Sequence, residues 1–301
     1  MSPSSSNAAT PSARLAVIGG SGFYEMNGLA DVERWETVTP FGPPSDAITI
    51  GTLDGGTSSG TRVAFLPRHG PGHSLLPQEV PFRANIWALK RMGVEGIIAV
   101  SAVGSLREEI VPGEMVVPDQ IIDRTRHDRP TTFFGGGIVA HVGFADPFCA
   151  DLSARLVAAG RVMGASMHAG GTYIAMEGPL FSTRAESRLY RTWGGSIIGM
   201  TAVPEAKLAR EAEIAYAMLA TATDYDVWHT SEADVSVEVI LERLQQNVLS
   251  AKGIVGALIR DLPLDWTSTA RGALQYAIVT EAARIPAQVR EDLAPIIGDY
   301  V

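Results

Sequence analysis

The residues best suited to chemistry lie in the stretch from residue 67 to residue 77, Pro-Arg-His-Gly-Pro-Gly-His-Ser-Leu-Leu-Pro. Arg68, His69 and His73 stand there among glycines and prolines, directly after residues 62–66, a run that predicts a strand. A guanidinium offers a planar fork of donors, an imidazole offers another, and glycines leave backbone N–H groups approachable. The stretch therefore favours an anion site at the carboxyl end of a strand, where open α/β sheets place their ligands.

A metal site and a solvated loop are the alternative interpretations of this stretch. A metal site would pair His69 with His73, but the Gly-Pro-Gly between them prevents the helix that would align the two rings. No glutamate stands where a zincin motif requires one. We therefore predict no metal. A solvated loop with incidental histidines stays open from the sequence alone.

Hydroxyl groups mark the ends of two further predicted strands. Residues 14–20 predict a buried strand that runs into Ser21, and residues 96–103 predict a second one that carries Ser101. Strand ends of this kind can hold a phosphate group. The first is not a complete dinucleotide motif, since a glutamate takes the place of the third glycine, and no Walker sequence is present. A plain turn is the alternative.

A pair of carboxylates, Asp224 and Asp226, follows the apolar run of residues 214–223. Strand alternation places both side chains on one face. Beside an apolar pocket, one member of such a pair has a raised pKa, which a proton donor at neutral pH requires. A calcium-like turn or a helix cap is the alternative. Phe181 follows the strand predicted at residues 171–176, where its ring either stacks on a flat ligand or packs in the core.

The order of strand and helix patterns predicts an α/β fold, a single domain with a central mixed β-sheet flanked by helices. A hairpin at residues 47–66 supplies the antiparallel part of that sheet. We expect residues 1–13 to form a disordered tail and residues 14–301 to form the domain. Further strands are predicted at residues 115–117 and 196–198, and helices at residues 82–92, 150–159, 183–193, 204–212, 235–260 and 285–297.

Composition excludes several classes of partner. The net charge is −9, with only three lysines among 24 basic residues, and no basic run is dense enough to follow a phosphate backbone, so we expect no nucleic acid. No apolar run approaches the roughly 20 residues that span a bilayer, so we expect no membrane partner. Cys149 is the only cysteine, which fits a reducing compartment such as the cytoplasm.

Eight motifs, in order along residues 14–259, carry a family resemblance. They are Gly19-Gly20-Ser21-Gly22, Pro40-Phe41-Gly42-Pro43-Pro44-Ser45-Asp46, Arg68-His69-Gly70, Arg83-Ala84-Asn85-Ile86-Trp87-Ala88-Leu89-Lys90, Gly104-Ser105-Leu106-Arg107-Glu108-Glu109, Glu177-Gly178-Pro179, Met200-Thr201 and Asp224-Tyr225-Asp226. The chain resembles the trimeric purine nucleoside and 5′-methylthioadenosine phosphorylases. It departs from them at Leu180, where arginine is common, and at Gly199, where asparagine is usual.

The resemblance implies a homotrimer with a nucleoside phosphorylase-like fold that cleaves S-methyl-5′-thioadenosine with inorganic phosphate to adenine and 5-methylthioribose 1-phosphate. The reaction that the resemblance implies needs no metal or organic cofactor. The implied phosphate ligands are Ser21, Arg68, His69, Ser101, Ala102 and Thr201. The implied nucleoside ligands are Met200 at the ribose, Phe181, Ser182, Asp224 and Asp226 at the base, and His73, Val237 and Ile240 at the 5′ group, with Asp224 as the catalytic acid.

The choice of base depends on two of these residues. Family members that cleave 6-oxopurine nucleosides resemble one another in having glutamate and asparagine where this chain has Ser182 and Asp224. A carboxylate can accept from a 6-amino group and donate to N7, so the pair favours adenine. A phosphorylase of inosine, guanosine or methylthioinosine is the alternative enzyme. A non-catalytic nucleotide or phosphate sensor is the alternative from another class, since fold does not fix function.

Overall fold

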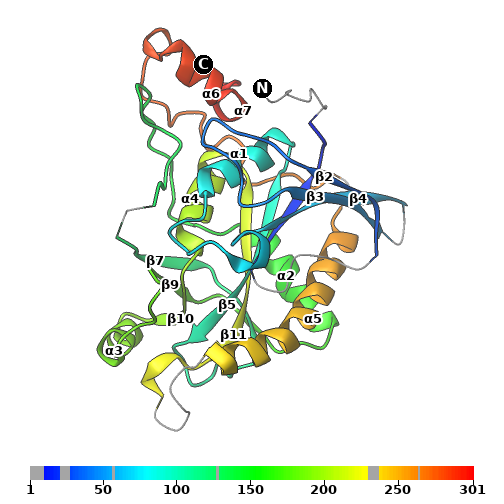
Figure 1. Cartoon of the computed structure of the whole chain (residues 1–301), viewed down its shortest axis with the longest axis vertical. Helices are drawn as coiled ribbons and strands as arrows, with labels where there is room; N and C mark the ends of the chain where they lie inside the picture. The colour runs from blue at the N-terminus through cyan, green and yellow to red at the C-terminus, as the bar shows by residue number, and fades with distance from the viewer. Residues whose placement is uncertain (1–9, 21–27, 56–57, 127–128, 230–236, 264) are drawn as a thin grey trace.

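The computed structural model describes residues 10–20, 28–55, 58–126, 129–229, 237–263 and 265–301. Within them, eleven strands form one mixed sheet at the centre of the molecule (Figure 1). The strands are β1 (Leu15–Gly19), β2 (Leu29–Trp35), β3 (Ile48–Gly55), β4 (Ser58–Pro67), β5 (Gly96–Ser105), β6 (Met115–Val117), β7 (Gln120–Arg124), β8 (Met167–Ala169), β9 (Thr172–Met176), β10 (Gly195–Gly199) and β11 (Ala215–Asp224).

Helices cover both faces of this sheet. Around β5 and β11, Figure 1 shows α1 and α4 on one side and α2 and α5 on the other. The helices are α1 (Phe82–Arg91), α2 (Ala150–Val162), α3 (Arg184–Thr192), α4 (Ala202–Glu211), α5 (Val237–Asp261), α6 (Ala287–Asp292) and α7 (Ala294–Ile297), with short 3-10 turns η1 (Pro71–His73), η2 (Asp226–Trp228) and η3 (Ala282–Arg284).

The core has two parts because successive strand residues point to opposite faces. In β1, Ala16 and Ile18 pack with α1 and α4, whereas Leu15 and Val17 pack with α2 and α5. Strands buried on both faces read as continuous apolar runs, which is why β1, β5 and β11 were easy to predict.

The topology of β5 creates the site. β5 pairs in parallel with β1 along one edge and with β11 along the other, and at its carboxyl end it also pairs with β10 in antiparallel fashion. β4 is parallel to β1, and β9 is parallel to β10. The carboxyl ends of these strands therefore meet around the end of β5, so the chain segments that leave them face one another.

The predicted mixed α/β fold is confirmed, and most predicted elements are present. The sequence did not predict β2, β7 or β8, which are short or largely solvent-facing and lack a clear apolar pattern. The helix predicted at residues 285–297 is divided into α6 and α7, since proline enters the second helix at its start. Residues 1–9 of the predicted tail lie outside the described residues, whereas Ala13 is buried and donates its N–H to Met92.

Candidate active site

A cavity of about 550 Å³ opens at the carboxyl end of β5. Several segments that leave neighbouring strands line it, and most of the predicted site residues are among them. The predicted residues on its wall are Arg68, His69, His73, Ser101, Ala102, Phe181, Met200, Thr201, Asp224 and Asp226. The fold therefore brings together side chains that lie up to about half the chain apart in sequence.

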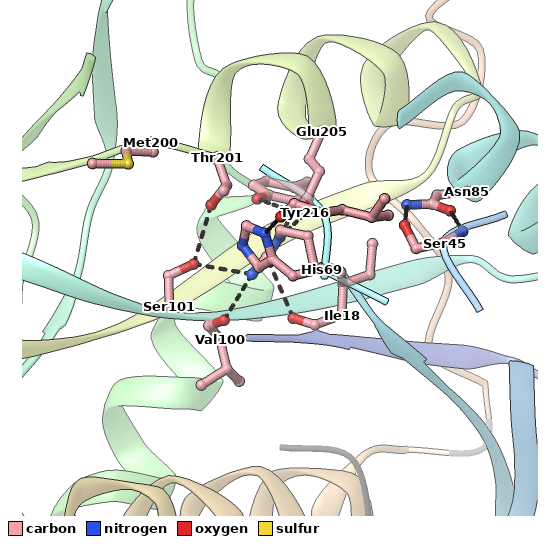
Figure 2. A network of polar contacts seen from close by, with 12 residues as sticks. Ile18, Ser45, His69, Asn85, Val100, Ser101, Met200, Thr201, Glu205 and Tyr216 are labelled. Atoms are coloured by element: carbon pink, nitrogen blue, oxygen red, sulfur yellow. Dashed lines mark hydrogen bonds and ion pairs between the residues drawn. The ribbon is translucent and has the colours of Figure 1, made fainter. Parts of the chain in front are cut away.

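Arg68 lines one end of this cavity and is fully buried. Its guanidinium pairs with Glu205 through two hydrogen bonds, one of them 3.0 Å long. It also donates to the carbonyl oxygens of Val100 (3.1 Å) and Ile18 (3.2 Å) and to the hydroxyl of Ser101 (3.2 Å), three acceptors that are labelled in Figure 2. An arginine has five N–H donors, so each of them already has an acceptor in the protein.

The charge of Arg68 is compensated in place. Burial by itself lowers the pKa of this guanidinium, but the facing Glu205 carboxylate outweighs burial, and the net pKa is raised. The hydroxyl of Tyr216 also donates to Oε2 of Glu205 at 2.9 Å, the oxygen that accepts from Nη2 of Arg68. Ser101 accepts from Arg68, so its hydroxyl can donate its own proton to a neighbouring acceptor.

Ser101 and Thr201 form the polar wall beside Arg68. Their hydroxyl oxygens lie 3.3 Å apart, although the residues stand on β5 and at the start of α4. Both hydroxyls are buried and line the cavity (Figure 2). Two hydroxyls at this spacing, next to a helix N-terminus, can donate to two oxygens of one tetrahedral anion.

His69 enters the same end of the cavity in its neutral form. Burial and the charge on Arg68 lower the pKa of His69 to about 4. Nδ1 lies 2.9 Å from the Leu75 carbonyl, which can only accept, so Nδ1 carries the proton and Nε2 is left as an acceptor. His73 stacks on this ring at 4.2 Å between centroids, and burial lowers the pKa of His73 too.

The two carboxyl groups occupy another part of the wall. Asp224 accepts from the hydroxyl of Thr223 and from the backbone N–H of Asp226, both at 2.7 Å. Burial and the charge on Asp224 raise the pKa of Asp226 to about 6. Gly104 makes room for the pair, because a side chain there would begin 3.0 Å from an Asp224 oxygen.

The predicted reason for this pairing was wrong in one respect. Alternation along a strand does not bring the two carboxylates together, since β11 ends at Asp224 and Asp226 begins the turn η2 with a φ of 51°. The backbone reverses there and returns the second carboxyl to the cavity. Both side chains nevertheless line the cavity, as the sequence predicted.

Phe181 and Ser182 differ in position. Phe181 lines the cavity and is 43% exposed, so its ring is available to a ligand. Ser182 is absent from the cavity wall as described, and its hydroxyl contacts the sulfur of Met176 at 3.5 Å. Leu180, which stands between Pro179 and Phe181, is 84% exposed, and its side chain has no polar group to offer a ligand.

Three predicted ligands fall where side chains are not described. Ser21 lies outside the described residues. Val237 and Ile240 belong to the first turns of α5, but their side chains also lie outside the described part. From later turns of the same helix, Val248 and Ala251 reach the cavity wall.

The sequence did not reveal the buried residues that bond to the site residues and fix their positions. Glu205 was assigned only to a helix, yet it is fully buried in an otherwise apolar stretch of α4, and that pattern was the available signal. Arg129 is another buried cation. It donates to the side chain and the carbonyl of Glu177 and to the carbonyl of Met200.

The described part of the chain contains neither a cluster of metal ligands nor a membrane-spanning helix. No group of three or more His, Cys, Asp or Glu side chains there is arranged to hold a metal ion. None of the helices described is both long and apolar enough to cross a membrane.

The fold is that of a known class of enzyme. A family model described as "Phosphorylase superfamily" matches residues 14–260. The S-methyl-5′-thioadenosine phosphorylase of Geobacter sulfurreducens is 58% identical over 95% of this chain and 99% of its own length, and that of Chloroflexus aurantiacus is 56% identical over 96% and 99%. The chain belongs to the phosphorylase superfamily and, within it, to the family of S-methyl-5′-thioadenosine phosphorylases.

Solved structures give the same result. A methylthioadenosine phosphorylase from an Antarctic soil metagenomic library has a TM-score of 0.88 and 46% identity, covering 95% of this chain and 99% of that one. A methylthioadenosine phosphorylase from Schistosoma mansoni, solved with adenine, has a TM-score of 0.79 and 36% identity, covering 86% and 96%.

Proposed function

We propose that this protein cleaves S-methyl-5′-thioadenosine with inorganic phosphate, yielding adenine and 5-methylthioribose 1-phosphate. The observation that carries the proposal is a single cavity with anion-binding groups at one place on its wall and a carboxyl pair at another. Family membership supports the same reaction. We propose further that the reaction takes place in the cytoplasm, without a metal or organic cofactor.

The first requirement of this reaction is a phosphate held against the sugar. The hydroxyls of Ser101 and Thr201 donate hydrogen bonds to it, and Arg68 polarises Ser101 by donating to the Ser101 hydroxyl oxygen. His69 accepts a hydrogen bond at Nε2 from the hydroxyl that the phosphate retains, since its Nδ1 proton is engaged with Leu75. We assign Ser21 and the backbone at Ala102 to the same anion. Phosphate then stabilises the positive charge that develops on the sugar in the transition state.

The second requirement is a flat, apolar place for the nucleoside. Met200 borders the ribose and Phe181 supplies a ring face for the purine. His73 and α5, with Val237 and Ile240, are assigned to the 5′-methylthio group. The neutral state of His73 suits an apolar substituent, since a charged imidazole would keep its water.

The third requirement is a proton for the departing base. We assign Asp224 to N7, with Asp226 shaping its environment and Ser182 lying next to the base site. Two carboxyls this close titrate together, and the raised pKa of Asp226, about 6, keeps part of the population singly protonated near neutral pH. As the glycosidic bond breaks, that proton moves to N7 and the base leaves neutral.

One assay tests the reaction and its alternatives together. The protein, with a chelator present, is incubated with methylthioadenosine, adenosine or inosine, each with and without phosphate, and the free base is measured. We expect adenine from methylthioadenosine only when phosphate is present. Hypoxanthine from inosine as the main product would instead identify a 6-oxopurine phosphorylase. No free base under any condition would leave the sensor interpretation.

We also propose a homotrimer, which rests on the family resemblance. Residues 133–148 are rich in apolar side chains, a pattern that by itself predicts an interface, but the structure gives these side chains another role. Phe133 and Phe148 are buried within the chain itself, and Phe134, Val142 and Phe144 pack against the same core. Exposed apolar side chains remain nearby, with Tyr276 at 91% and Val279 at 65%.

A further inference from the structure

The cavity wall contains a glycine that has no room for a side chain. Gly199 ends β10 and precedes the site residues Met200 and Thr201. A Cβ atom built on it would lie 2.2 Å from the hydroxyl oxygen of Tyr173 and 2.9 Å from the ring carbon that carries that oxygen. The ring belongs to the neighbouring strand β9 and is fully buried, so it cannot move aside.

Tyr173 uses that space for a hydrogen bond. Its hydroxyl oxygen accepts from the backbone N–H of Thr201 at 3.4 Å. The adjacent N–H of Ala202, the first residue of α4, interacts with the same oxygen. Burial raises the pKa of Tyr173 to about 12, so the hydroxyl keeps its proton at every working pH. Tyr173 itself is absent from the cavity wall as described.

The peptide between Met200 and Thr201 is therefore held at both ends. Arg129 donates to its carbonyl oxygen and Tyr173 accepts from its N–H. This peptide joins the residue assigned to the ribose with the residue assigned to the phosphate. Its orientation decides where the Thr201 hydroxyl lies relative to Ser101, 3.3 Å away.

We infer that Tyr173 is a positioning residue for the phosphate site, which fixes the N–H of Thr201 from the neighbouring strand, and that Gly199 is a glycine in order to admit it. The inference rests on the proposed function, since it concerns the same cavity. It assigns a role to a residue that touches neither substrate and acts only through Thr201.

The bond has a local equivalent that makes the inference testable. A short side chain with an acceptor oxygen at position 199 could bond the N–H two residues later, as asparagine does in an Asx turn. The chain has room for either the distant hydroxyl or the local side chain, but not for both. Asparagine at position 199 should therefore replace Tyr173 only when the tyrosine ring is shortened.

The first experiment removes the hydroxyl alone. Tyr173→Phe should raise KM for phosphate about fivefold, the usual effect of one lost hydrogen bond. The KM for the nucleoside should stay unchanged, because Arg129 still holds the Met200 carbonyl. Tyr300→Phe is the matched control, since it removes a hydroxyl bonded to Glu213 at 2.7 Å and Tyr300 is not part of the described cavity wall. It should leave both KM values unchanged.

The second experiment is a rescue. Tyr173→Leu shortens the side chain to where the ring begins, and should raise KM for phosphate at least as much as Tyr173→Phe. Adding Gly199→Asn to Tyr173→Leu should return KM for phosphate toward the wild-type value, whereas Gly199→Asn alone should impair it, because the new side chain meets the ring. This dependence of one substitution on the other is the signature of a shared position.

Phosphate binding alone is measured in parallel, as the shift in Tm when inorganic phosphate is added without nucleoside. A wild-type protein that binds phosphate but cleaves no nucleoside refutes the proposed reaction, while the Tm shifts still test Tyr173. Equal phosphate affinity in the wild type and Tyr173→Phe overturns the inference. If Tyr173→Phe does not fold, the double variant decides: folded protein with wild-type phosphate affinity supports the inference, and folded protein with weak affinity overturns it.

Discussion

Asp224 and Asp226 show how two side chains of one type acquire different properties. Asp224 accepts two hydrogen bonds of 2.7 Å, whereas burial and the charge on Asp224 raise the pKa of Asp226. In the proposed chemistry the two carboxyls share one proton, and that proton is transferred to the leaving base.

Asp224→Asn keeps the shape of the side chain and removes its proton. We expect kcat/KM on methylthioadenosine to fall by about 10²-fold, with a smaller loss on inosine, since an amide N–H suits a 6-oxo group. Asp226→Asn should be milder. The measurement is the ratio of kcat/KM values for the two nucleosides at saturating phosphate. A larger loss in Asp226→Asn would make Asp226 the donor, and unchanged values in Asp224→Asn would remove it from the base site.

Asp226 also predicts how stability depends on pH. Its pKa is about 6 in the folded protein against an ordinary value of 3.8. Folding therefore favours the protonated form, so the contribution of Asp226 to stability is most favourable below about pH 4 and falls as the pH rises from there through 6. Asp226→Asn removes this penalty of about 2 to 3 kcal/mol. We expect its gain in Tm over the wild type to be larger at pH 8 than at pH 4.5. An equal gain at both values would contradict the raised pKa.

At the scale of elements, the pair formed by Arg68 and Glu205 joins the loop after β4 to helix α4. Both side chains are almost fully buried, at 1% exposure each, and they lie 137 residues apart in the chain. A buried pair of this kind is costly to break from one side only, because the remaining charge stays in an apolar environment.

Arg68→Met should lower the free energy of unfolding by about 3 to 5 kcal/mol. It should also weaken the binding of phosphate far more than the binding of nucleoside. Arg68→Met combined with Glu205→Met should cost less than the sum of the two single changes, since no charge is left unpaired. Urea denaturation of the three variants gives the comparison. Simple additivity would show that the two residues do not act as a pair.

Helix α3 begins directly after the predicted base residues. The hydroxyl of Thr183 accepts from the N–H of Glu186, and the Glu186 carboxylate accepts from the N–H of Thr183, which is a complete capping box. Thr183→Ala should lower the free energy of unfolding by about 1 kcal/mol, and Thr183→Ser should preserve it. Thermal unfolding of both variants tests this. Equal losses in both would mean that the hydroxyl does not stabilise the helix.

At the scale of the whole molecule, the sheet topology brings the site residues together at the carboxyl end of β5. The proposed assembly of the chain is a trimer. Light scattering should give three times the 31.9 kDa chain mass at working concentration. The mass should not change when the sample is diluted within the assay range. A mass of one chain under those conditions would contradict the trimer.

Much of the site could be predicted because its residues sit in local patterns. Arg68, His69 and Ser101 follow or belong to apolar runs, and a strand that runs into polar residues places them at the edge of a sheet whatever the rest of the fold. Asp224 was found in the same way. Local patterns also gave the α/β class, since strand and helix periods differ along the chain.

The sequence by itself determined which chemical groups this protein brings to its site, because strand ends and their polar residues are encoded over a few positions. Only the tertiary structure decided how those groups are held. Tyr216 and Tyr173 carry no local signal, and Glu205 carries only that of a carboxylate in an apolar stretch, since each acts on a residue of another element across the core. The turn of Asp226 back to the cavity depends on one left-handed residue, and the absence of a side chain at Gly199 depends on a ring from the next strand. Contacts of this kind are properties of packing, which a pattern along one segment does not contain.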